Sequence, residues 1–67
     1  MSRRLLSTVQ VSDEIGVPVT TLRYWRSRNE GPRSFKVGRG VRYREGDVDE
    51  WLNEQMEVTG RGDVVSA

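Results

Sequence analysis

A glycine and a proline two residues apart, Gly16 and Pro18, constrain the fold of this chain more than any other feature. Upstream, Ser7 and Gln10 form a capping-box pattern, which predicts that a helix begins at Thr8. Gly16 predicts the end of that helix, and Pro18 suits the first turn of another. The spacing therefore predicts two short helices joined by a three-residue turn, a helix-turn-helix pattern that any corner between two helices can share.

The second helix is predicted over residues 18–28. At 100° per residue, Leu22 and Trp25 lie on one side of it, and we expect both to anchor a core. The remaining residues of interest lie at the flank of the apolar side (Thr21), at the border (Arg26) and on the opposite side (Thr20, Arg23, Tyr24 and Ser27).

Over residues 35–44 the spacing of apolar residues changes from a helical period to a period of two. Apolar and basic residues alternate there, which predicts two half-buried strands joined by a glycine-rich turn at 38–40. The predicted inward residues are Phe35, Val37, Val41 and Tyr43, and the predicted outward ones are Lys36, Arg42 and Arg44.

A third helix is predicted to start near Glu45 or Asp47, because acidic side chains suit the positive end of a helix dipole. Its apolar stripe consists of Val48, Trp51, Leu52 and Met56. We expect one domain over residues 1–56 and a flexible tail over 57–67, where glycines, polar residues and small apolar ones mix.

A chain of 67 residues forms one small domain, which buries only about 60% of the surface that its unfolded form exposes. Each large apolar side chain is therefore expected to serve the core. The candidates are Leu5, Leu6, Val11, Ile15, Leu22, Trp25, Phe35, Val37, Val41, Tyr43, Val48, Trp51 and Leu52.

The sequence contains no cysteine and no histidine. A disulfide framework and the usual zinc sites are thereby excluded, and little is left to act as nucleophile or general base. We expect no catalytic residue, no metal, no cofactor and no enzymatic activity. No apolar run approaches the roughly 20 residues of a membrane span. We therefore expect no membrane partner, and we expect the protein to be cytoplasmic.

The net charge of +1 hides two halves of opposite sign. Residues 1–44 hold ten Lys and Arg against three acids, which gives +7, and residues 45–67 hold one Arg against seven acids, which gives −6. This asymmetry favours a polyanionic partner for the basic half. The alternative is that the acidic segment folds over the basic one and neutralises it.

The order helix, turn, helix, hairpin, helix predicts a small α+β fold of the winged helix-turn-helix type, whose second helix enters the major groove of double-stranded DNA. Trp25 is assigned to the core, whereas Arg42 and Arg44 have Glu45, Asp47 or Glu50 as alternative partners. The predicted DNA contacts are Thr20, Thr21, Arg23, Tyr24, Arg26 and Ser27 on the recognition helix, and Lys36, Arg39, Arg42 and Arg44 on the wing.

Residues 7–52 also resemble the MerR-like winged helix-turn-helix group that includes excisionases and AlpA-type regulators. The resemblance rests on the segments IGVPVTTLRYW, VRYR and DVDEWL occurring together, whereas Val9 and Ser12 depart from the group's usual first helix. The group implies DNA contacts at Thr20, Arg23, Tyr24 and Arg39, in agreement with the helical wheel.

Within that group, the resemblance implies an excisionase, also called a recombination directionality factor, acting in a bacterial host cell at the nucleoid. Such proteins bind repeated sites beside an attachment site, bend the DNA and assist a tyrosine integrase. Because so small a domain holds DNA weakly alone, cooperative self-association on DNA is expected. A small transcription regulator is the first alternative, and a protein-interaction module that does not bind DNA is the second.

Overall fold

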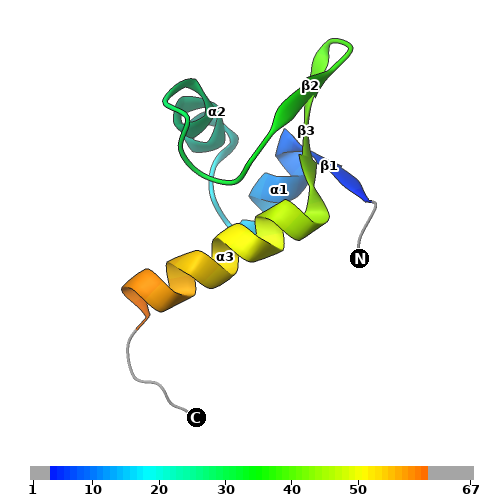
Figure 1. The fold of residues 1–67 in the computed structure, drawn as a ribbon. Coiled ribbons are helices and arrows are strands. Elements are labelled where there is room, and N and C mark those ends of the chain that lie inside the picture. Colours follow the sequence, from blue (N-terminus) through cyan, green and yellow to red (C-terminus); the bar gives the residue numbers. More distant parts are fainter. Residues whose placement is uncertain (1–3, 61–67) are drawn as a thin grey trace.

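The computed structural model describes residues 4–60, so the predicted tail from residue 61 onward lies outside the described residues. It confirms a small α+β fold with a helix-turn-helix and a β-hairpin (Figure 1). A third strand, β1, was not predicted. The elements are β1 (Leu5–Ser7), α1 (Thr8–Ile15), α2 (Val19–Ser27), β2 (Phe35–Val37), β3 (Gly40–Arg44) and α3 (Glu45–Thr59).

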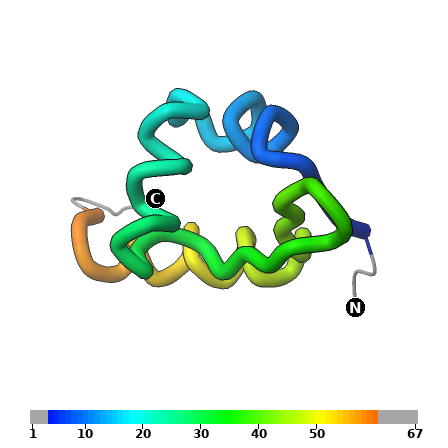
Figure 2. Tube along the Cα trace, turned by 90° about the horizontal axis from the view of Figure 1, so that it is seen from above, coloured from blue at the N-terminus to red at the C-terminus, as the bar shows by residue number. Residues whose placement is uncertain are grey.

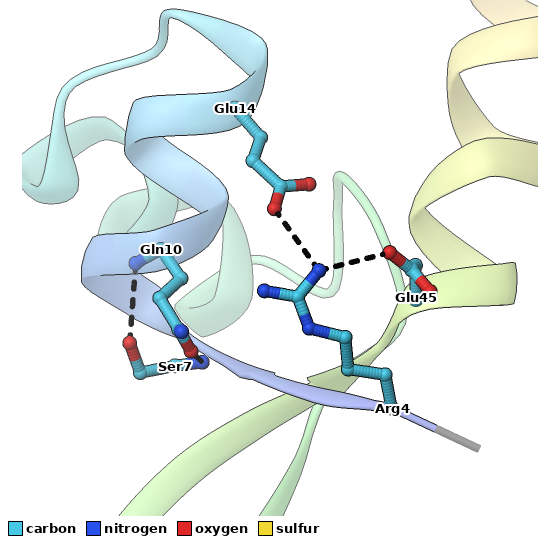
Figure 3. A network of polar contacts seen from close by, with 5 residues as sticks. All are labelled: Arg4, Ser7, Gln10, Glu14 and Glu45. Carbon is cyan, nitrogen blue, oxygen red and sulfur yellow. Dashed lines mark hydrogen bonds and ion pairs between the residues drawn. The ribbon is translucent and has the colours of Figure 1, made fainter. Parts of the chain in front are cut away.

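Helix α1 begins at Thr8 and ends at Ile15, as the capping pattern predicted. The Ser7 backbone N–H donates to the Gln10 side-chain oxygen at 2.8 Å, and the Gln10 backbone N–H donates to Ser7 Oγ at 3.1 Å (Figure 3). Gly16 then adopts a left-handed conformation with φ of 73° and closes the helix. The tight connection to α2 follows from this cap.

The strand β1 pairs with β3 in a three-stranded antiparallel sheet of order β1-β3-β2. Leu6 lies opposite Tyr43 in this pairing and is fully buried. Just before the strand, the Arg4 guanidinium lies 3.9 Å from Glu14 of α1 and 3.3 Å from Glu45 of α3 (Figure 3). The N-terminal strand thus connects the first and last helices through the sheet.

The hairpin differs from its predicted register. Its turn has two residues, Gly38 and Arg39, because Gly40 pairs with Val37 inside the ladder. A positive φ of 60° at Gly38 suits a turn with glycine at its first central position. A three-residue turn would have placed Val37 opposite Val41 instead.

This difference of one residue moves the side chains of β2 to the other face of the sheet. Phe35 pairs with Arg42, so it shares a face with the basic residues of β3 and not with Val41 and Tyr43. Phe35 and Val37 are 37% and 47% exposed. The prediction that both belong to the core is therefore wrong.

The core consists of one buried side chain from each element except β2. Burying a side chain of this size stabilises the fold by about 1.5–3 kcal/mol. Leu5 and Leu52, also predicted in the core, are exposed. The five core residues are Leu6, Val11, Leu22, Tyr43 and Val48, with Ile15, Val17, Trp25 and Val41 packed around them.

Helix α3 begins at Glu45, the first of the two predicted starts, and continues through Thr59. Residues 57–59 are therefore helical, although they were predicted to lie in the tail. Trp51 packs against Trp25 of α2 with ring centroids 5.5 Å apart, which fixes the two helices to one another. The later turns of α3 extend away from the sheet (Figures 1 and 2). No helix within residues 4–60 has the length and apolar character needed to cross a membrane.

Candidate nucleic-acid interface

Helix α2 is oriented by its apolar side. Leu22 is 1% exposed, and Trp25 is half-buried beside it. The predicted outward residues Thr20, Arg23 and Tyr24 are exposed, and we call these three the reading face of α2. Thr21, also a predicted contact, is half-buried on the flank, as its place on the helical wheel suggested.

At the C-terminal end of α2, the side chains of the outward face interact with one another. Ser27 Oγ donates to the Tyr24 carbonyl oxygen at 2.7 Å, and the Arg28 guanidinium lies 5.5 Å from the centre of the Tyr24 ring. Arg28 also pairs with Glu30 at 3.6 Å. Tyr24 remains 56% exposed, so its hydroxyl is available to a partner in solvent.

Arg26, the border residue of the helical wheel, lies at the junction between α2 and the sheet. Its Nε donates to Ser34 Oγ at 2.9 Å, just before β2 begins. Ser34 and Thr8 also hydrogen-bond to the phenol of Tyr43. Burial raises the pKa of Tyr43 above its ordinary value, and Thr8, Arg26 and Ser34 oppose that shift. This polar cluster holds Arg26 beside the hairpin.

The hairpin β2–β3 is the wing of this fold, and Arg39 lies exposed in its turn. Lys36 pairs with Val41, so it is on the sheet face that carries the helices, although its own side chain is exposed. Figure 1 shows the tip of the hairpin on the same side of the molecule as α2, with α3 on the other. The turn that carries Arg39 therefore lies on the α2 side of the molecule.

Arg42 and Arg44 lie on the opposite face of the sheet. Arg42 Nη1 donates to the Val41 carbonyl oxygen at 2.9 Å, and the Arg44 guanidinium lies 5.8 Å from the centre of the Phe35 ring. Neither arginine forms an ion pair with Asp47 or Glu50 in the described part of the chain, and Glu45 pairs with Arg4. The predicted alternative partners are therefore not the ones these arginines contact.

Arg33, a basic residue near α2, was missing from the predicted set of DNA contacts. Arg33 lines the same surface pocket as Arg26 and Asn29, in the loop between α2 and β2. Asn29 has a positive φ of 58°, which turns the chain sharply after the helix. In the sequence, Arg33 directly follows Gly31 and Pro32, and a basic residue in that position could have been added to the predicted contacts.

The acidic helix does not neutralise the basic surface. Among residues 4–60, the only ion pair between α3 and the preceding part of the chain joins Glu45 to Arg4. In the described residues, no other acid of α3 forms an ion pair with a basic residue of α2 or the wing. Such pairs would be expected if α3 folded closely over that surface. Arg33 shares a surface pocket with Asp47, Glu50 and Glu54, but most of the other charged side chains of α2, the wing and α3 are exposed to solvent.

Residues 5–56 match the model of a family described as a helix-turn-helix domain. That match spans both helices, the hairpin and most of α3. No curated protein and no solved structure matches the chain.

Proposed function

Because the chain belongs to the helix-turn-helix domain family, which implies DNA binding, we propose that it is a sequence-specific excisionase. The family is often found in excisionase-like proteins. The observation that carries the proposal is the orientation of α2. Burial of Leu22 and packing of Trp25 leave Thr20, Arg23 and Tyr24 exposed to solvent, and the hairpin tip lies on the same side of the molecule as α2.

In the proposed complex, α2 lies in the major groove of the DNA. Arg23 forks onto the O6 and N7 atoms of a guanine, and Thr20 contacts a thymine methyl group or a phosphate. Tyr24 donates its hydroxyl to a phosphate, while Arg26 and Ser27 lie along the backbone at the end of the helix. These contacts need no large rearrangement, because the side chains are already exposed.

The wing supplies the second set of contacts. Arg39 in the exposed turn reaches a narrow minor groove, where the negative potential is strongest. Lys36, on the helix side of the sheet, contacts the backbone between the two grooves. Insertion of the wing bends the DNA, which is the mechanical step that excision requires.

We place this binding at repeated sites beside an attachment site at the bacterial nucleoid, where several copies assist a tyrosine integrase. The test is excision in vitro with the integrase encoded beside the gene and a substrate carrying both attachment junctions. Product is expected only when this protein is present. Equal product in its absence would rule out the excisionase role and leave a small transcription regulator, which the same DNA interface also supports.

A further inference from the structure

The sheet has a face that the helices do not cover, and we call it the outer sheet face. The strand register places Leu5, Phe35 and Val37 there, together with Arg42 and Arg44. The three apolar side chains are 44%, 37% and 47% exposed. Leu5 pairs with Arg44 and Phe35 pairs with Arg42 across the strands. The Arg44 guanidinium also lies over the Phe35 ring. The surface is therefore apolar and basic at once.

Helix α3 carries the opposite combination. Leu52 and Met56 are one turn apart on it and are 37% and 65% exposed. Asp49 and Asn53 flank them at helical spacing, and Glu57 follows Asn53 by four residues. We call this surface the α3 ridge. It is apolar along its middle and acidic along its edge.

The two surfaces complement one another in charge. Arg42 and Arg44 form no ion pair in the described part of the chain, and neither do Asp49 and Glu57. Burying a charge against an unlike charge costs less than burying it unpaired, so each surface suits the other as a partner. Neither suits a second copy of itself, since like charges would meet.

Within one molecule, the two surfaces do not meet. Val48 is buried in the core and Trp51 packs on Trp25, which fixes the direction of α3. Both views show β1 toward one end of the molecule and the last turns of α3 toward the other (Figures 1 and 2). The molecule is elongated, with extents of 43 × 27 × 19 Å. Among residues 4–60, neither surface has a partner within its own molecule.

We infer that the α3 ridge of one copy docks on the outer sheet face of a second copy. This contact is head-to-tail, so each added copy leaves one free surface of each kind, and the assembly grows as an open row instead of a closed dimer. The inference deepens the proposed function, because a row of copies is what binding at repeated sites needs. It assigns Arg44 to the carboxylates of the neighbouring copy.

The test is sedimentation velocity of the full chain without DNA at low salt, over a range of concentrations. The wild type is expected to show a series of species that grows with concentration and shrinks with added salt. Leu5→Glu places a like charge against the acidic ridge, and Met56→Lys does so against the basic face. Each variant alone is expected to be monomeric, and their equimolar mixture to associate, because one wild-type surface of each kind remains.

The sign of the charge supplies the matched controls. Leu5→Lys and Met56→Glu remove the same apolar side chains but keep the charge complementary, so both are expected to associate. Val58→Lys alters the other side of α3 and is expected to associate like the wild type. Thermal unfolding of each variant checks that the domain remains folded.

A wild type that remains monomeric at every concentration would overturn the inference, as would a mixture that remains monomeric or variants whose behaviour ignores the sign of the charge. Affinity for a random-sequence duplex that holds one copy is measured separately. A wild type that does not bind this duplex contradicts the proposed function. A wild type that binds the duplex but does not self-associate contradicts only the head-to-tail contact.

Discussion

Replacing Gly31 by alanine tests how α2 is held in place. Gly31 has a φ of 78°, and a Cβ at this position would lie 2.8 Å from Trp25 Cε3 and 3.3 Å from Trp25 Cβ. Contact at 2.8 Å is shorter than side chains tolerate, so the indole must move. Since Trp25 packs on Trp51, that movement disturbs the connection between α2 and α3.

The cost has two parts. A positive φ at a residue with a Cβ costs about 1–2 kcal/mol, and the lower entropy of the unfolded alanine chain returns about 0.4–1 kcal/mol. Displacing the indole adds about 1–3 kcal/mol for overpacking, as in other crowded cores. We expect Gly31→Ala to destabilise the domain by about 2–4 kcal/mol, a large fraction of the roughly 3–10 kcal/mol available to a chain of this length.

Gly16→Ala and Gly38→Ala are the matched controls. Their φ values are 73° and 60°, close to that of Gly31, but a Cβ at either position meets nothing within 4 Å. Thermal unfolding followed by circular dichroism is expected to show a fall in Tm of roughly 5 °C for each control and at least about 10 °C for Gly31→Ala. Equal falls for all three variants would refute the reasoning that Gly31 is needed to seat Trp25.

Three other changes separate the reading face, the wing and the core. Arg23→Ala is expected to weaken binding at the cognate site by about 1–3 kcal/mol and to relax discrimination at one base pair, as measured by competition with single-base variants. An equal loss on random DNA would instead assign Arg23 to the backbone. Arg39→Ala is expected to lower affinity and bending together in a gel-shift phasing assay, and an unchanged bend angle would exclude a minor-groove contact. The raised pKa of Tyr43 means that the folded state favours the neutral phenol, so stability is retained below about pH 10 and falls as the pH rises further. Urea unfolding against pH is expected to show this fall in the wild type and in Tyr24→Phe, but a smaller one in Tyr43→Phe.

The helices were predictable because their signals are local. Ser7, Gln10 and Gly16 mark both ends of α1, and the wheel of α2 separates Leu22 from Arg23 without any knowledge of the rest of the chain. The start of α3 at Glu45 has the same origin in its acidic first turn. Its end was placed too early, since no residue before Gly60 prevents the helix from continuing.

The sheet was harder to predict because its pairing joins distant residues. The three residues of β1 have no strand signature of their own, and they form a strand only because Leu6 finds Tyr43 across the sheet. The turn at Gly38 allowed either two or three residues, and that choice decides which face Phe35 occupies. A local pattern does not contain this information.

The candidate site follows the same division. The exposed positions of Thr20, Arg23 and Tyr24 come from the periodicity of one helix, and the structure bears out their exposure. The positions of Arg26 and Arg33 depend on a loop that returns to α2, which no helical wheel represents. Contact of any of these residues with DNA is still a prediction.

The central claim is that the reading face of α2 and the wing together bind a DNA duplex, with some of their contacts made to phosphates. The most direct test is the affinity of the full chain for a duplex carrying its site, identified by a footprint on DNA flanking the gene, as a function of salt. The logarithm of the binding constant is expected to fall linearly with the logarithm of salt concentration, with a slope of about −0.9 for each phosphate contacted. Binding that does not change with salt, or no binding at low salt, would contradict the account.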